Sequence, residues 1–313
     1  MATSSAAVRP PRSLPEWIRT RPPAGPLYPE VRALLAAHRL GTVCQEAKCP
    51  NLPECWSAGT ATVMLLGTDC TRRCAFCAVN THWSHGEVDL TEPARVAEAV
   101  QAWGLRYIVL TQVCRDDLED GGASVLAATV RSIRARCPET LVELLIGDLA
   151  AREASLRTVA EAQPDVLAHN LETVRRLTPT ARDHRAGYDR SLDVLRTAKR
   201  VAPGSLVTKS SVMLGLGETD EELATAFDDL RGADVDLLTL GQYLRPSSAH
   251  APVQRYPTPQ EFDQLRDLAL ARGFSGVESG PLVRSSYRAE ELYRRAVAPR
   301  ERSSWRWSFR TRG

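Results

Sequence analysis

Cys70-Thr-Arg-Arg-Cys74-Ala-Phe-Cys77 is a C-x3-C-x2-C triad that directly follows an apolar run of the sequence. Three thiolates at this spacing can hold three irons of a four-iron, four-sulfur cluster. The fourth iron would then lack a protein ligand, and an open coordination position is where a metal site performs chemistry. The alternatives are a structural zinc site, which usually shows paired C-x2-C halves and four ligands, or three buried free cysteines. The spacing favours the iron–sulfur cluster.

The segment before this triad carries a second one, a C-x4-C-x5-C pattern made by Cys44, Cys49 and Cys55. Six of the eight cysteines fall between residues 44 and 77, and this crowding is hard to explain by core packing. Two prolines and Asn51 lie among these cysteines, so we expect a ligand-bearing loop instead of a regular helix. Two triads indicate two iron–sulfur clusters, one on each triad.

The bulk composition is ordinary for a globular chain of 313 residues, with 43% hydrophobic and 25% charged residues. The net charge of +2 gives no indication of nucleic-acid binding. No apolar stretch reaches the length of a membrane span, and the first residues lack the apolar core of a signal peptide. Residues 1–15 weakly resemble a transit peptide, but prolines argue against the helix that such a peptide needs. We expect a flexible arm there, a cytoplasmic protein, and no nucleic-acid or membrane partner.

From residue 61 onward, short β-type runs alternate with amphipathic helical patterns. The strand candidates are residues 62–66, 107–112, 141–146, 166–169, 206–214 and 237–242. Helices are indicated over residues 29–39, after Thr91, after Gly121-Gly122, near Asp189, and after the capping boxes that begin at Thr219 and Thr258.

This alternation argues for a parallel sheet built from βα units. The fold class that we predict is α/β, a partial (β/α)6 barrel, although periodicity alone cannot separate it from an open doubly wound sheet. The Cys70 triad decides for the barrel, because it follows the first strand at the end where α/β barrels assemble active sites. We predict an amino-terminal extension over residues 1–60, the barrel over 61–275, and a carboxy-terminal extension over 276–313.

The last residues form a basic tail. Residues 288–313 contain eight arginines against three glutamates. Such a tail is usually solvated. The alternative is an electrostatic docking strip for an acidic protein partner.

Nine segments together resemble the lipoyl synthase family of radical S-adenosylmethionine enzymes, over almost the whole chain. They are residues 42–51, 54–62, 70–77, 115–122, 169–173, 185–188, 208–218, 241–247 and 284–287, the last reading Arg-Ser-Ser-Tyr. The two cysteine triads combined with a late Arg-Ser-Ser-Tyr are highly specific. The resemblance implies the radical S-adenosylmethionine type of barrel, with extensions that carry an auxiliary cluster.

The resemblance also implies the activity, that of a sulfurtransferase. Two sulfurs are inserted at C6 and C8 of an octanoyl group on a lysine of a lipoyl carrier domain, and two S-adenosylmethionine molecules are consumed. The cofactors implied are two [4Fe-4S] clusters and S-adenosylmethionine, and the auxiliary cluster supplies the sulfur. Further implied partners are an electron donor of the ferredoxin or flavodoxin type and an iron–sulfur cluster carrier.

The same resemblance assigns residues to these roles. Cys70, Cys74 and Cys77 would hold the radical-generating cluster, while Cys44, Cys49, Cys55 and Ser285 would hold the auxiliary cluster, with Ser285 also catalytic. The cofactor contacts would be Asn170, Glu172, Gly215, Gly217 and Glu218; Lys209 and Arg245, near strand ends, are further cations that could meet a carboxylate. Ser303 lies in a partial repeat of the Arg-Ser-Ser-Tyr motif, but Ser285 follows Gly280-Pro-Leu-Val as in the family.

Two other functions remain as alternatives. One is a different radical sulfur-inserting enzyme, similar to biotin synthase or to a methylthiotransferase; those families lack the early triad and late Arg-Ser-Ser-Tyr together. The other is a non-catalytic iron–sulfur carrier, which the βα pattern disfavours. The chain also departs from the family at Cys114, where Asp is usual, so a local contact to S-adenosylmethionine or substrate is in doubt there.

Overall fold

The computed structural model describes residues 14–19, 22–23, 25–204 and 206–297. Its main sheet has the strand order β1-β2-β5-β6-β7-β8-β9-β10, and every neighbouring pair is parallel except β1 with β2. The strands are β1 (Gly41–Thr42), β2 (Thr62–Leu65), β5 (Tyr107–Gln112), β6 (Leu141–Leu145), β7 (Val166–Ala168), β8 (Val207–Leu214), β9 (Leu237–Gln242) and β10 (Gly276–Gly280). The six predicted strands are thus confirmed as β2 and β5 to β9.

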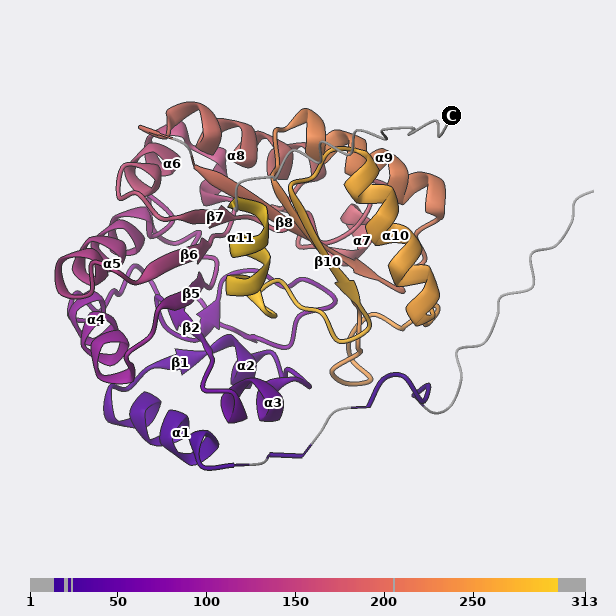
Figure 1. The fold of residues 1–313 in the computed structure, drawn as a ribbon. Helices are drawn as coiled ribbons and strands as arrows, with labels where there is room; N and C mark the ends of the chain where they lie inside the picture. Colours follow the sequence, from indigo (N-terminus) through magenta and orange to yellow (C-terminus); the bar gives the residue numbers. More distant parts are fainter. Residues whose placement is uncertain (1–13, 20–21, 24, 205, 298–313) are drawn as a thin grey trace, which may run out of the picture.

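Helices cover the outer face of this curved sheet, as Figure 1 shows. They are α4 (Glu92–Trp103), α5 (Ala123–Arg136), α6 (Glu153–Ala160), α8 (Tyr188–Val201), α9 (Asp220–Gly232) and α10 (Pro259–Ala271), with the short α7 (Thr178–Ala181). Both predicted capping boxes are present, because Thr219 and Thr258 each accept from the backbone N–H of a glutamate three residues on. The apolar faces of the helices pack on the strands, and this packing forms the core.

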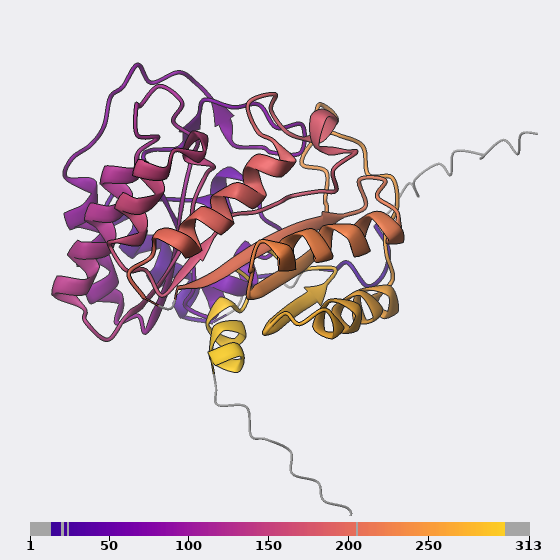
Figure 2. The ribbon, with the colours of Figure 1, turned by 90° about the horizontal axis from the view of Figure 1, so that it is seen from above.

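The extensions close the two edges and one end of the sheet. β10 is a further strand, not among the six predicted, that pairs in parallel with β9, and α1 (Leu27–Ala37) precedes β1. Helix α11 (Ala289–Val297) lies across one end of the barrel, opposite the loops that follow β2 (Figure 2). Its Tyr293 ring lies 6.0 Å from that of Tyr107, the first residue of β5. Helix α11 therefore covers the amino ends of the strands and leaves the carboxy ends for the site.

The segment of the first three cysteines is more regular than predicted. It contains the short helices α2 (Val43–Glu46) and α3 (Leu52–Ser57), so the expectation that its prolines prevent helix formation was wrong. Pro53 is tolerated because it lies in the first turn of α3, where the missing N–H has no helical partner to lose. Thr42 caps α2 by accepting from the N–H of Gln45.

Two earlier expectations fall outside the described residues: the flexible arm before residue 14 and the part of the basic tail after Val297. Among the residues that are described, no helix has the length and apolar character needed to cross a membrane.

A buried ion pair lies inside the barrel, below the carboxy ends of the strands. The Nζ of Lys209 lies 2.8 Å from Oε1 of Glu143, and both side chains are about 1% exposed. The Tyr107 hydroxyl donates to the same carboxylate at 2.7 Å. Lys209 is the third residue of β8, so it lies deeper than the expected position at a strand end. Its carboxylate partner belongs to the protein.

Replacing Lys209 with Met should destabilise the protein by about 3–5 kcal/mol, because it leaves the Glu143 carboxylate buried without its cation. The matched control is Lys199→Met, since the pair that Lys199 forms with Asp236 is about one fifth exposed and should matter less. Urea unfolding monitored by circular dichroism measures both. Equal losses for the two variants would contradict the assignment of Lys209 to a desolvated pair.

Candidate active site

A cavity of about 570 Å³ opens at the carboxy ends of the strands. The last residues of β5, β6 and β9 (Gln112, Leu145 and Gln242) all line it. Five of the six triad cysteines also line it, and so does the predicted serine ligand: Cys44, Cys49, Cys70, Cys74, Cys77 and Ser285. Segments more than two hundred residues apart therefore meet at one space, large enough for a cofactor and a substrate chain.

The loop of the Cys70 triad is fixed by contacts with other loops at this end of the barrel. The Ala75 N–H donates to the carbonyl of Ala181 at 2.8 Å, and the Ala75 carbonyl accepts from the N–H of Ala251 at 2.8 Å. A ring nitrogen of His250 lies 3.1 Å from the carbonyl oxygen of Cys77. These bonds position the three thiols without using the thiols themselves.

The three thiols of this triad differ in their surroundings. The Cys70 sulfur accepts from the backbone N–H of Arg72 at 3.4 Å and is hydrogen-bonded to the side chain of Cys114. The bond from Cys114 is the main reason that the pKa of Cys70 falls to about 6, while the same bond raises the pKa of Cys114. Burial instead raises the pKa of Cys77 to about 12. A metal that bound to Cys77 would therefore have to displace a proton.

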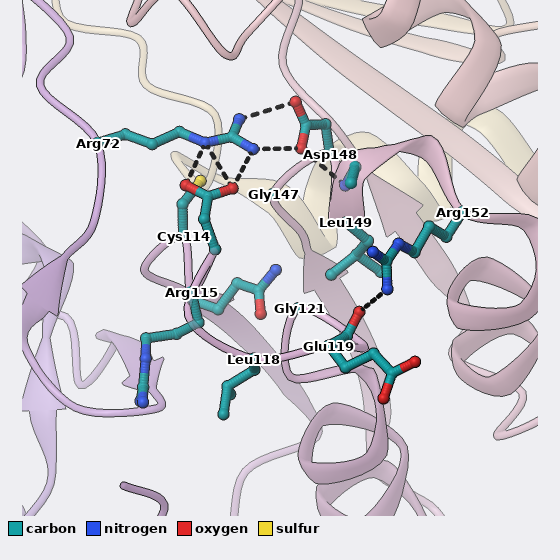
Figure 3. A pocket seen from close by; sticks show the side chains of 13 residues that line it. Arg72, Cys114, Arg115, Leu118, Glu119, Gly121, Gly147, Asp148, Leu149 and Arg152 are labelled. Carbon is teal, nitrogen blue, oxygen red and sulfur yellow. Dashed lines mark hydrogen bonds and ion pairs between the residues drawn. The ribbon is translucent and has the colours of Figure 1, made fainter. Parts of the chain in front are cut away.

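Arg72, inside the triad, joins two aspartates behind the cavity (Figure 3). Its guanidinium lies 2.6 Å from Asp116 and 2.7 Å from Asp148, and the Arg72 and Asp148 side chains are almost fully buried. Burial opposes ionisation of both carboxylates, but the hydrogen bonds from Arg72 outweigh it and lower the pKa of each. Sequence reasoning missed this network because its members come from three different loops.

A second brace holds the start of the same loop. Arg115 donates to Asp117 at 2.8 Å, with both side chains 2% exposed or less, and to the carbonyls of Leu66 and Glu87. Asp117 in turn accepts from the N–H of Gly86 at 2.9 Å. The segment that contains the triad is thus tied at both ends to the loop after β5.

Asp117→Asn should lower the free energy of unfolding by about 1.5–3 kcal/mol near neutral pH, because it removes charged hydrogen bonds from Arg115. Those bonds also hold the pKa of Asp117 down, to about 2. A depressed pKa gives stability that is complete above the unfolded pKa of about 4 and is lost as the pH falls toward 2. The gap between the two proteins should therefore shrink from pH 7 to pH 3 in urea unfolding of the cluster-free chains. A gap that stays constant over this range would contradict the prediction.

In the triad of Cys44, Cys49 and Cys55, Cys44 lies in α2, Cys55 lies in α3 and Cys49 lies in the turn between the two helices. The Cys49 N–H donates to the Cys44 carbonyl at 2.9 Å, and this bond closes the turn between the first two cysteines. Burial, with a smaller contribution from the neighbouring thiols of the triad, raises the pKa of Cys44 and raises that of Cys55 to about 12. Cys55 does not line the cavity and packs against the core. The three thiols still lie close enough to affect one another's ionisation.

Three contacts hold the Arg-Ser-Ser-Tyr segment near the triad of Cys44, Cys49 and Cys55. The Thr62 hydroxyl donates to the Ser286 hydroxyl at 2.8 Å, and the Tyr287 hydroxyl donates to the Glu54 carboxylate at 2.9 Å. The Asn51 side-chain amide donates to the carbonyl of Leu282. Ser285 lies between these contacts and lines the cavity. The segment that contains Ser285 is therefore fixed near Cys44 and Cys49.

Gly241 in β9 makes this docking possible. A Cβ built at Gly241 would lie 2.0 Å from the carbonyl oxygen of Val283, so only glycine allows the segment to approach the strand this closely. Arg284, which follows Val283 in the sequence, lines the cavity and interacts electrostatically with Cys49. Among the described residues no carboxylate forms an ion pair with Arg284, and its guanidinium donates to the carbonyl of Val283 at 2.6 Å.

Two of the predicted cofactor-binding residues line the cavity. Asn170 donates to Glu172 at 3.2 Å, and burial raises the pKa of Glu172. The side-chain oxygens of Asn170 and Gln112 are buried there without a hydrogen-bond partner in the protein. Unsatisfied buried acceptors are costly, so these two oxygens are positions where a bound ligand or a water molecule would supply donors.

The other three predicted cofactor contacts do not line the cavity. Gly215 and Gly217 have φ of 98° and 108°, in the region that favours glycine. The Glu218 carboxylate accepts from the N–H groups of Gly215 and Leu216, at 2.6 and 2.9 Å, and so holds the turn. Arg245 does line the cavity, and its guanidinium donates to the carbonyl of His250 at 2.8 Å.

The donor set at the cavity, free thiols from both triads, fits the ligands that iron–sulfur clusters take. All eight cysteines are free thiols. Within the described parts of the chain, no group of three or more His, Cys, Asp or Glu side chains converges as ligands of one ion must. A zinc ion with Zn–S bonds of about 2.3 Å needs such convergence, whereas the larger cluster keeps its thiolates further apart.

Comparison with known proteins agrees with this geometry. Residues 64–230 match the Radical SAM superfamily. The chain is 54% identical over 281 residues to the lipoyl synthase of Halorhodospira halophila, covering 90% of this chain and 84% of that protein. It is 55% identical to the lipoyl synthase of Thermus thermophilus, covering 91% and 88%, and 52% identical to that of Pyrobaculum arsenaticum, covering 93% and 98%.

Solved structures support the fold. A crystal structure of methylornithine synthase matches with a TM-score of 0.54 at 14% identity, covering 78% of this chain and 73% of that one. The crystal structure of HydG, a maturase of the [FeFe]-hydrogenase, matches with a TM-score of 0.55 at 13% identity, covering 85% and 59%. The partial barrel predicted from the sequence is therefore confirmed. The chain belongs to the lipoyl synthase family within the Radical SAM superfamily.

Proposed function

We propose that the cavity is where this sulfurtransferase inserts two sulfur atoms into an octanoyl group, with one four-iron cluster on each of two walls. The single observation that carries the proposal is the lining of one cavity by cysteines of both triads and by Ser285. A radical made at one wall and sulfur held at the other would then reach the same carbon. The substrate is an octanoyl group on a lysine of a lipoyl carrier domain.

On the first wall, Cys70, Cys74 and Cys77 would hold three irons and leave the fourth for S-adenosylmethionine. When bound, this cluster supplies the electron that cleaves S-adenosylmethionine into a radical able to take hydrogen from an unactivated carbon. Asn170 and Glu172 would orient S-adenosylmethionine beside Cys74, because their polar atoms line the cavity there. The Gly215–Gly217 turn would support the carboxy end of β8 and would not contact the cofactor itself.

On the second wall, Cys44, Cys49, Cys55 and Ser285 would hold the auxiliary cluster, whose sulfides the substrate takes. A serine oxygen is a harder and more labile ligand of iron than a thiolate. Ser285 would therefore be the ligand that is released as sulfur leaves. The Arg284 guanidinium would balance the negative charge of the thiolates on this wall.

The rest of the lining suits an alkyl chain. The cavity surface between the two walls is mainly apolar and includes Val43, Met64, Val113, Ile146 and Val283. Such a lining would bind the octanoyl chain and exclude water, which protects a carbon radical from side reactions. The remaining partners that we propose are an electron donor of the ferredoxin or flavodoxin type and an iron–sulfur cluster carrier, acting in the cytoplasm.

The test is oxygen-free reconstitution followed by reaction with S-adenosylmethionine, a reductant and an octanoyl-lysyl peptide. We expect a peptide product that has gained two sulfurs, with two molecules of 5′-deoxyadenosine formed per product, measured by mass spectrometry. Cluster binding without cleavage of S-adenosylmethionine would favour an iron–sulfur carrier. Cleavage without sulfur in this peptide would favour a different radical enzyme.

Ser285→Ala should weaken the auxiliary cluster selectively, since it removes one oxygen ligand and leaves the three thiolates. We expect a chelator to remove iron faster from the cluster on Cys44, Cys49 and Cys55. Sulfur insertion should fall strongly, while cleavage of S-adenosylmethionine should stay unchanged. The matched control is Ser303→Ala, in the partial repeat of the motif, which should behave like the unmodified protein. Equal behaviour of the two variants would remove Ser285 from the ligand set.

A further inference from the structure

The residues that line the cavity differ in how far they reach solvent. Most of them are buried or half-buried, and the exposed ones within the described chain are Leu14, Lys48 and Arg245. A side chain that lines a cavity and is also exposed lies at its opening. Arg73, whose neighbours on both sides line the cavity, is a further exposed cation. Three cations therefore border the mouth of the cavity.

No carboxylate balances these three charges. Among the described residues, Lys48, Arg73 and Arg245 form no ion pair. The carboxylates that line the cavity are those of Asp148 and Glu172, and neither residue is exposed. Asp148 is also neutralised by its arginine partner at 2.7 Å. The mouth thus presents positive charge to solvent, with no exposed acid in the cavity lining.

Two of the cations are placed by separate loops. Lys48 lies in the turn between α2 and α3, with φ of 51°, and its side chain has no hydrogen-bond partner in the described part of the chain. Arg245 follows β9, and its guanidinium donates to the carbonyls of His250 and Ser248. His250 lies 3.1 Å from the carbonyl oxygen of Cys77. These neutral acceptors orient Arg245 but leave its charge uncompensated.

We infer that these three cations bind an acidic surface of the lipoyl carrier domain, next to its octanoyl-lysine. This inference rests on the proposed function, which brings the octanoyl group into the cavity from that lysine. When the acyl chain enters the cavity, the carrier surface around the lysine must cover the mouth. A cationic mouth is complementary to an acidic surface and repels a basic one. Leu14, at the same mouth, offers an apolar contact to the methylene groups of the lysine.

The experiment compares fluorescently labelled octanoyl-lysyl peptides of equal length, in which the lysine is flanked by glutamate, by glutamine or by further lysines. Fluorescence anisotropy measures their binding to the full-length reconstituted protein at low and at high salt. The variants are Lys48→Gln and Arg245→Gln, with Lys48→Arg and Arg245→Lys as partners that preserve the charge. The control is Arg106→Gln, because Arg106 is an exposed cation directly before β5, at the other end of the strand from the cavity.

We expect the glutamate peptide to bind the unmodified protein most tightly and the lysine peptide most weakly, with a smaller difference at high salt. Lys48→Gln and Arg245→Gln should each weaken binding of the glutamate peptide by roughly two- to fivefold, the scale of one exposed charge pair. Binding of the neutral glutamine peptide should change less. The charge-preserving variants and Arg106→Gln should bind all the peptides as the unmodified protein does.

Equal affinity of the unmodified protein for the glutamate and glutamine peptides would overturn the inference. Lys48→Gln and Arg245→Gln proteins that lose affinity for all the peptides alike would also overturn it, because recognition of charge would not explain such a loss. Loss of affinity for S-adenosylmethionine alone would assign the cations to the cofactor instead. Failure of the proposed function looks different: the peptides would bind with the expected preference, but none would gain sulfur when S-adenosylmethionine and a reductant are added.

Discussion

Replacing Cys44 with Ala should leave the cleavage of S-adenosylmethionine intact and abolish sulfur insertion. Cys44 and the loop from Cys70 to Cys77 both line the cavity, and the proposed site of cleavage is on that loop. The variant loses one of three thiolates that must share a cluster, so the auxiliary cluster should not persist. A substrate radical formed in the cavity would then have no sulfide to attack.

The measurement has two readouts from one reaction, 5′-deoxyadenosine and sulfur-containing peptide. In the Cys44→Ala protein the first should stay within about twofold of the unmodified protein, and the second should fall by roughly a thousandfold, the scale at which loss of a reacting group is felt. Cys70→Ala should abolish both products, and Cys137→Ala, which removes a thiol outside both triads, should abolish neither. Sulfur insertion by the Cys44→Ala protein would disprove the auxiliary cluster as sulfur source.

The barrel could be predicted from the sequence because its signals are local. Strands β2, β5, β6, β7 and β9 each contain a short apolar run, and the capping threonines Thr219 and Thr258 need only a glutamate three residues on. The cysteine spacing is local in the same sense. Strand β10 was missed because glycines begin and end it and its middle is polar, so it has no apolar run to detect. It forms because β9 offers an open edge.

The partners of individual side chains could not be predicted in this way. Lys209 was expected near a carboxylate of the cofactor, but it is neutralised by Glu143 from another strand. Glu218 was expected to contact the cofactor, but it accepts from its own turn. In both cases the residue type indicates a charge that needs a partner, and only the packed fold shows which partner it has. The prediction that Ser285 lies near the Cys44 triad rested on the family resemblance and not on a pattern in the sequence.

Gly241→Ala should displace the Arg-Ser-Ser-Tyr segment. The proposed auxiliary cluster should then be lost, while the proposed cluster on the Cys70 triad should remain. The new Cβ would lie 2.0 Å from the carbonyl oxygen and 2.9 Å from the carbonyl carbon of Val283, and both atoms are backbone. No side-chain rotation can relieve such a contact, so the segment that contains Ser285 must move. Overpacking of this kind typically costs about 1–3 kcal/mol, which is enough to undock a segment held by a few hydrogen bonds.

The matched control is Gly280→Ala, at the last residue of β10. A Cβ there would lie 3.4 Å from a Val283 methyl group, which is an ordinary contact. After reconstitution, iron and sulfide analysis should show about one cluster fewer per chain in the Gly241→Ala protein than in the Gly280→Ala protein. Cleavage of S-adenosylmethionine should persist in both, because the Cys70 loop is anchored to Ala181 and Ala251 instead. A full complement of both clusters in the Gly241→Ala protein would show that the auxiliary site does not depend on the docked carboxy-terminal segment. Ser285 would then lose its structural support as the fourth ligand.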